Sequence, residues 1–153
     1  MNLLRVAELN AAYAATIDHD RLEAWPDFFV EDCLYKITSA GNHRRGYAAG
    51  VVYADSRAML RDRVTALRTA NIYERQSYRH IIGLPMIVSA APDGIVAETP
   101  FLVARILRDA QTDLFATGVY LDKLHDEAGQ LRFVERIVVC DSGHFDTLLA
   151  IPL

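Results

Sequence analysis

The chain has 153 residues, of which 52% are hydrophobic and 24% charged, a balance typical of a globular protein and not of a disordered one. Its 20 acidic residues outnumber 16 basic ones and give a net charge of −4, which argues against a nucleic-acid partner because such proteins are usually basic. No apolar run approaches the ~20 residues of a membrane span, and no signal peptide is visible. We therefore expect a cytoplasmic protein with one domain over residues 1–153.

Three helices are predicted in the first half of the chain. Apolar residues at spacings of three and four predict an amphipathic helix with the stripe Val6, Leu9, Tyr13 and Ile17. Residues 21–29 predict a short second helix whose aromatic side chains, Trp25, Phe28 and Phe29, plug a core. A third helix begins at Asp55 or Ser56, either of which suits an N-cap. Its buried stripe is Met59, Leu60, Val64 and Leu67.

Strand patterns fill most of the rest. Residues 32–38 alternate as a strand does, and residues 39–42 predict a turn. Four β-rich stretches follow, at 77–90, 95–108, 113–124 and 131–141. Turn signals separate them at 92–94 and 126–129, with a weaker one at 109–112. Helices followed by hairpin-linked strands indicate an α+β fold, with the helices packed on one face of a curved antiparallel sheet.

The sequence offers no recognisable metal or nucleotide site. Cys33 and Cys140 have no nearby cysteine or histidine partner loop, so a Rieske cluster cannot be built from them. Asp141 and His144 have the spacing of one fragment of a mononuclear iron site, but no second histidine follows them. Glycine-rich phosphate loops and a nucleophile elbow are also missing.

One catalytic arrangement stays open as an alternative. A cone formed by a curved sheet can hold a carboxylate or histidine base opposite a tyrosine donor. The candidates are Asp32 or His80 as the base, with Tyr13 or Tyr35. This predicts a stand-alone isomerase, dehydratase or cyclase with an open pocket, whereas Trp25, Phe28 and Phe29 sealing the cone would contradict it. A homo-oligomeric binding module without chemistry is a third hypothesis.

Two groups of residues favour a subunit interface. Residues 71–80 are rich in charged and aromatic side chains, and Tyr and Arg are enriched at protein interfaces. Glu135 and Arg136, followed by Asp141 and Ser142, form the second group. An apolar stretch at 148–153 strengthens the expectation, because an exposed apolar segment is an aggregation risk.

Several motifs in a fixed order resemble a known family. They are AWPDFF at 24–29, YRHIIG at 78–83, TPF at 99–101, GVYLDKL at 118–124, VERIVVCDS at 134–142 and DTLLAIPL at 146–153. Together they resemble the small (beta) subunits of aromatic-ring-hydroxylating dioxygenases along essentially the whole chain. The NIYER segment at 71–75 and the Pro-Leu ending resemble the terephthalate-oxidising members most.

The resemblance implies a ketosteroid-isomerase-like, or nuclear-transport-factor-like, cone with a mixed or antiparallel sheet. It implies a non-catalytic scaffold with no catalytic, cofactor-binding or metal-binding residues of its own. The Rieske 2Fe–2S cluster and mononuclear Fe(II) would lie in a large (alpha) subunit, with NAD(P)H electrons arriving through a separate reductase. The implied assembly is a trimer of alpha–beta pairs, with contacts between small subunits, that cis-dihydroxylates terephthalate or a similar aromatic carboxylate. The expected subunit contacts are Tyr78, Arg79, His80, Arg136 and Asp141.

Overall fold

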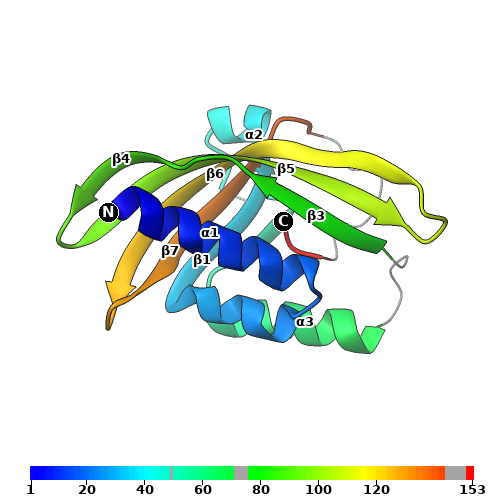
Figure 1. Ribbon diagram of the computed structural model, residues 1–153, viewed down its shortest axis with the longest axis horizontal. Helices are drawn as coiled ribbons and strands as arrows, with labels where there is room; N and C mark the ends of the chain where they lie inside the picture. Colours follow the sequence, from blue (N-terminus) through cyan, green and yellow to red (C-terminus); the bar gives the residue numbers. More distant parts are fainter. Residues whose placement is uncertain (49, 71–75, 144–150) are drawn as a thin grey trace.

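The computed structural model describes residues 1–48, 50–70, 76–143 and 151–153. Within these residues, three helices and a 3-10 helix accompany a curved mixed sheet in the strand order β2-β1-β7-β6-β5-β3, with β4 also paired to β5. Figure 1 shows α1 and α3 on the concave side of the sheet. The elements are α1 (Asn2–Asp18), η1 (Leu22–Phe28), β1 (Phe29–Ser39), α2 (Ala40–Arg44), β2 (Val52–Ala54), α3 (Arg57–Ala70), β3 (Gln76–Ile82), β4 (Met86–Ala91), β5 (Gly94–Leu107), β6 (Thr112–Glu127) and β7 (Gln130–Cys140).

Helix α1 confirms the first predicted helix, and its buried face differs from the expectation at one position. Val6, Tyr13 and Ile17 are buried as predicted, but Leu9 is only partly buried. Asn10 takes the core position instead and is 1% exposed. A buried amide needs hydrogen-bond partners, and the partners of Asn10 lie on the sheet.

Helix α3 confirms the third predicted helix and its cap. The Ser56 hydroxyl accepts a hydrogen bond from the Met59 amide at 3.2 Å, which satisfies one of the free N–H groups of the first turn. The predicted stripe is confirmed at Leu60, Val64 and Leu67, which are buried. Met59 was expected in the same stripe but is 39% exposed. The buried face of the helix runs through positions 60, 64 and 67, and residue 59 lies beside that face.

The predicted aromatic segment forms a 3-10 helix followed at once by a strand. Within it Trp25 and Phe29 are fully buried, and Phe28 is partly buried. Their rings meet edge to face with neighbours, as Trp25 does with Tyr35 at a centroid distance of 5.2 Å. Such pairs add to the area that the rings bury. The aromatic side chains therefore pack in the core, as the sequence predicted.

The stretch predicted as one strand at 77–90 is two strands, β3 and β4. Both pair antiparallel with β5, which is long enough at 14 residues to hold them end to end. The break falls at residues 83–85, where Pro85 has no N–H to offer a strand ladder. The predicted turns at 92–94 and 126–129 are confirmed as the links between β4 and β5 and between β6 and β7.

The sheet is mixed because β1 runs parallel to β7, its partner from the far end of the chain. Local sequence patterns do not reveal which strands pair, so only tertiary structure decides this contact. Two short elements were also missed. The predicted turn at 39–42 opens α2, in which the Ser39 hydroxyl accepts from the Asn42 amide at 3.1 Å. Strand β2 has only three residues, too few for a periodic pattern.

Candidate functional site

The interior of the cone holds an ion pair between neighbouring strands. Arg136 on β7 and Asp122 on β6 are register partners. The guanidinium donates from Nε to Oδ1 and from Nη2 to Oδ2, both at 2.8 Å. Both side chains are 0% exposed. Bidentate geometry of this kind is the strongest form of an Arg–carboxylate contact.

Helix α1 completes the polar network through Asn10. Nη2 of Arg136 donates to Oδ1 of Asn10 at 2.5 Å, and the amide nitrogen of Asn10 donates to the Thr99 hydroxyl at 3.3 Å. The buried asparagine thus joins the helix to two strands of the sheet. Without these partners its burial would be costly, which explains why an amide occupies the core stripe of an otherwise apolar helix face.

Aromatic rings surround the guanidinium. The Cζ atom of Arg136 lies 3.8 Å from the ring centroid of Tyr120, 4.0 Å from that of Phe133 and 4.4 Å from that of Tyr13. Ring faces carry negative potential and attract a cation, more so when water is excluded. The cage therefore offsets part of the cost of burying the charge.

Electrostatics keep this pair charged. For Arg136, burial disfavours the cation, but the Asp122 carboxylate outweighs burial and raises the guanidinium pKa above its usual value. Burial raises the pKa of Asp122, and Arg136 opposes that rise. The bidentate contact and the high pKa of the partner favour the ionised pair. Its arrangement positions strands and a helix, and the carboxylate is not open to accept a proton from a substrate.

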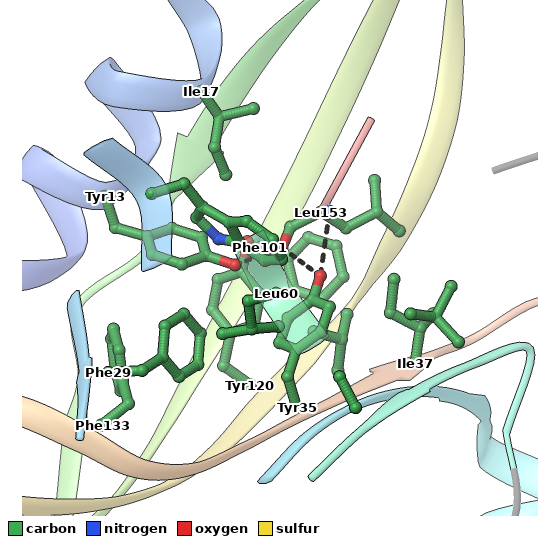
Figure 2. Packing of buried hydrophobic residues seen from close by; sticks show 14 of the residues in the cluster. Tyr13, Ile17, Phe29, Tyr35, Ile37, Leu60, Phe101, Tyr120, Phe133 and Leu153 are labelled. Carbon is green, nitrogen blue, oxygen red and sulfur yellow. Dashed lines mark hydrogen bonds between the residues drawn. The ribbon is translucent and has the colours of Figure 1, made fainter. Parts of the chain in front are cut away.

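Two buried tyrosines bind the last described segment. The hydroxyls of Tyr13 and Tyr35 donate to a main-chain oxygen of Leu153 at 2.6 Å and 3.0 Å, and the Leu153 amide donates to the Tyr35 hydroxyl at 3.2 Å. Figure 2 shows the two tyrosine hydroxyls pointing toward Leu153, with hydrogen bonds dashed. Burial raises the pKa of Tyr13 and raises that of Tyr35 well above its usual value. Both phenols are therefore neutral hydrogen-bond donors at physiological pH.

The four residues of the catalytic alternative do not converge. Tyr13 and Tyr35 are fully buried and engaged with Leu153, whereas Asp32 is exposed on β1. His80 bonds instead to Asp18 at the end of α1. Oδ1 of that aspartate lies 2.7 Å from Nδ1 of the ring, and Oδ2 accepts from the His80 amide at 2.8 Å. With Trp25 and Phe29 buried in the wall, this arrangement argues against the stand-alone enzyme hypothesis.

Of the five residues expected at subunit contacts, three are buried and two are exposed. Arg136 is 0% exposed, and Tyr78 and His80 are 3% and 6% exposed. Arg136 therefore acts within the core, and the two strand residues face inward because they have the same parity along β3. Arg79, between them, points outward with a side chain that is 61% exposed. Asp141 is exposed and accepts from the Thr117 hydroxyl at 2.8 Å.

Other parts of the predicted interface lie outside the described residues. They are the segment 71–75 and the first part of the apolar stretch at 148–153, and His144 of the possible iron-site fragment also lies outside them. Two important residues, Asp18 and Asp122, were missed by the sequence reasoning. Asp122 had a usable signal, because it is a carboxylate with the same strand parity as Tyr120 and Leu124, which are buried. A charge at an inward position indicates a buried partner.

The convex face of the sheet is apolar. Val119 lies opposite Val139, Leu121 opposite Ile137, and Ile81 opposite Leu102. These side chains are only half-buried, and Ile81 is 59% exposed. Helices α1 and α3 cover the other side, and Figure 1 shows the short α2 on the convex side. Beyond α2, the described residues therefore leave this apolar part of the sheet partly accessible.

Metal ligands do not gather in the parts of the chain that the structure covers. Among them, no group of three or more His, Cys, Asp or Glu side chains could hold a metal ion. Cys33 and Cys140 are buried free thiols. The residues present thus do not fit a Rieske cluster, which takes two cysteines and two histidines. Over the same described residues, no helix is long and apolar enough to cross a membrane.

Comparisons with known proteins agree with this arrangement. Residues 12–146 match the family described as ring hydroxylating beta subunit. The chain is 54% identical to a terephthalate 1,2-dioxygenase terminal oxygenase beta subunit of Comamonas sp over all 153 residues, covering 99% of that protein. It is 36% identical to the anthranilate 1,2-dioxygenase small subunit of Burkholderia cepacia, covering 95% of this chain and 90% of the relative.

A solved structure confirms the predicted cone fold. The beta subunit of an aromatic-ring-hydroxylating dioxygenase from Novosphingobium aromaticivorans superposes with a TM-score of 0.91 and 37% identity, covering 99% of this chain and 97% of that one. The family match spans far more than half of the chain, and the fold agrees over nearly its full length. The chain belongs to the ring-hydroxylating beta subunit family.

Proposed function

We propose that this chain is the small subunit of a dioxygenase that cis-dihydroxylates terephthalate or a similar aromatic carboxylate. The observation that carries the proposal is the 54% identity to a terephthalate 1,2-dioxygenase beta subunit over the whole chain. In this proposal the holoenzyme adds both atoms of O₂ to the ring and takes its electrons from NAD(P)H through a separate reductase. The Rieske cluster and the Fe(II) belong to the large subunit.

The role of this chain is to scaffold. Its interior is occupied by the Arg136–Asp122 ion pair and its aromatic cage, which tie α1 to β6 and β7. A rigid single domain of this kind can hold a partner in place without taking part in the chemistry. The accessible apolar face around Leu121 and Ile137 supplies area for such contacts, because apolar residues dominate the buried centre of stable subunit interfaces.

The proposed assembly is a trimer of alpha–beta pairs in which small subunits also contact one another. Arg79 and Asp141 are the two exposed members of the expected contact set. Both lie at the rim of the apolar face, on β3 and just after β7. Charged residues at a rim set orientation and association rate more than affinity.

Co-expression with a candidate large subunit tests the proposal. We expect the two chains to co-elute as a complex whose mass, from light scattering, matches three pairs. Iron and dihydrodiol formation from terephthalate should require the large subunit and be absent from the small subunit alone. A small subunit that elutes separately under all conditions would contradict the scaffold role. A complex that oxidises other aromatic carboxylates but not terephthalate would contradict terephthalate as the substrate and leave the scaffold role intact.

A further inference from the structure

Basic side chains gather on one segment of an acidic chain. Residues 36–54 contain Lys36, Arg44 and Arg45 and no aspartate or glutamate, although the whole chain carries a net charge of −4. The two arginines are exposed, at the end of α2 and directly after it. Among the residues that the structure describes, neither has a carboxylate within ion-pair distance. A local positive potential of this kind attracts a negatively charged partner.

Lys36 adds a third positive charge behind this segment. It lies on β1 and is 8% exposed, and its ammonium donates to the main-chain oxygens of Tyr47 and Ala48, both at 3.3 Å. Within the described part of the chain, no carboxylate lies within ion-pair distance of this ammonium either. Two carbonyl dipoles replace only part of the water that a buried charge loses, so this cation gains from a carboxylate brought near it.

The loop between α2 and β2 is held closely against β1. The Val51 amide donates to the Ile37 carbonyl oxygen at 2.8 Å. A Cβ atom at Gly50 would clash with that same oxygen, so only glycine allows the loop to approach so closely. Together with the bonds from Lys36, these contacts fix the loop before any partner binds, which lowers the cost of association.

Large side chains project from this loop and from β2. Tyr47 is 54% exposed, Val51 59% and Tyr53 45%. Tyrosine and arginine are the residues that most often anchor protein interfaces, because they bury a large area and keep a polar tip satisfied. Arg44, Arg45, Tyr47, Val51 and Tyr53 are called the α2–β2 surface below.

The strand register joins the α2–β2 surface to the apolar face. Tyr53 on β2 lies opposite Lys36 on β1. Lys36 lies opposite Ile137 on β7, which in turn lies opposite Leu121 on β6. Register partners point to the same side of a sheet, and Figure 1 shows α2 on that convex side. The α2–β2 surface is therefore the basic end of the face that contains Leu121 and Ile137.

We propose that the α2–β2 surface binds an acidic segment of the large subunit, whose carboxylates pair with Arg44 and Arg45 while its apolar side chains pack on Tyr47 and Tyr53. A two-fold contact between small subunits is disfavoured here, because it would bring each pair of arginines against its own copy. This inference rests on the proposed function, which supplies the partner, and adds where and through which chemistry that partner binds.

A carbodiimide cross-link locates the partner carboxylate. Arg44→Lys keeps the charge and supplies an amine, which the reagent joins to a carboxylate only at contact distance. In the complex co-expressed with a candidate large subunit, we expect mass spectrometry to link position 44 to an Asp or Glu of the large subunit. Lys123 and Glu135, whose Nζ and Oε2 atoms lie 3.7 Å apart, provide the control for the reaction in the isolated chain. A cross-link from position 44 to a small subunit, or none in an assembled complex, would overturn the proposal.

Charge reversal tests the same contact by affinity. Arg44→Glu combined with Arg45→Glu should raise the dissociation constant of the complex at least about tenfold, measured by mass photometry on dilution. Raising NaCl from about 50 mM to about 300 mM should weaken the unmodified complex, and this salt effect should be largely lost in the variant. Tyr47→Ala should also weaken assembly about tenfold, because it removes an aromatic anchor. The melting temperature of each variant chain should stay near that of the unmodified chain.

A matched control and the possible outcomes separate this inference from the proposed function. Arg21→Glu combined with Arg61→Glu makes the same change in net charge at exposed positions before η1 and on α3, and should assemble normally. If the reversal at Arg44 and Arg45 also assembles normally, this inference is overturned and the proposed function stands. If the unmodified chain does not assemble with the large subunit, the proposed function is contradicted, and this inference is overturned with it.

Discussion

Arg136 and Asp122 face each other across β6 and β7 and form a two-point ion pair that no solvent reaches. The pair ties the sheet to α1 through Asn10 and lies in the interior of the cone. Buried ion pairs are rarely a net source of stability, but breaking one is costly because a charge remains without its partner. Removing one partner should therefore destabilise the fold more than replacing both.

Replacing Arg136 with methionine should lower the free energy of unfolding by about 3–5 kcal/mol, because Asp122 is left buried and unpaired. Replacing both residues, as Arg136→Met with Asp122→Leu, should recover most of the loss. Chemical denaturation at pH 7 measures the free energy of unfolding of both variants. Lys123→Met is the control, since Lys123 pairs with Glu135 at 3.7 Å on an exposed side chain and should change stability by less than about 1 kcal/mol. An equal loss in Arg136→Met and the double variant would contradict this account.

The two tyrosines that bind Leu153 should differ in their effect on stability. Tyr13→Phe leaves the main-chain oxygen of Leu153 with one donor and should cost about 0.5–1.5 kcal/mol. Tyr35→Phe also removes the acceptor for the Leu153 amide, and the orphaned N–H raises the expected cost to about 1–3 kcal/mol. Thermal and urea unfolding of both variants provide the comparison. A larger effect at Tyr13 than at Tyr35 would be inconsistent with the observed bonds.

A charge on the convex face should disrupt assembly without unfolding the chain. Leu121→Glu places a carboxylate among half-buried apolar side chains, where a partner would have to bury it. We expect loss of co-elution with the large subunit and a melting temperature near that of the unmodified chain. Ala66→Glu on the exposed side of α3 should assemble normally. Normal assembly of Leu121→Glu would exclude this face from the interface.

Both cysteines should be unreactive in the folded chain. Burial is the main cause that raises the pKa of Cys33 to about 11 and that of Cys140 to about 12. The thiolate is the reactive form, so a disulfide reagent at pH 8 should modify almost none of the folded protein and both thiols after denaturation. Rapid modification of the native chain would mean that one of the two strands opens locally.

The contacts of Arg68 should contribute stability in a pH-dependent way. Arg68 on α3 donates to Glu23 of η1 at 2.8 Å and lowers the pKa of that carboxyl. A lowered carboxyl pKa stabilises the fold above the unfolded value of about 4.3, and this contribution disappears as the pH falls through the folded value. Glu23→Gln should therefore be slightly destabilising at pH 7, by less than about 1 kcal/mol because the pair is largely exposed. The difference should shrink as the pH falls below about 4, and thermal melts at pH 7 and at a series of lower pH values measure it.

The sequence by itself determined the longer helices and most of the long strands, with the order in which they occur. The spacing of Val6, Tyr13 and Ile17 specified a buried helix face, and the Ser56 cap and the turns at 92–94 and 126–129 were readable because they depend on neighbouring residues. The resemblance in motif order also identified the family. Strand parity would have placed Tyr78 and His80 inside and Arg79 outside, had it been applied to the interface candidates.

Only the tertiary structure decided which distant residues meet. The parallel contact of β1 with β7, the pairing of Asp122 with Arg136 and the seat of Leu153 between Tyr13 and Tyr35 join parts of the chain that are far apart in sequence or on different strands. No local pattern encodes such contacts, because each depends on how the whole sheet curves and on which strands become neighbours. For the same reason Arg136, a plausible surface residue in the sequence, is a core residue in the fold: its charge is acceptable there only because Asp122, Asn10 and three aromatic rings arrive from elsewhere in the chain.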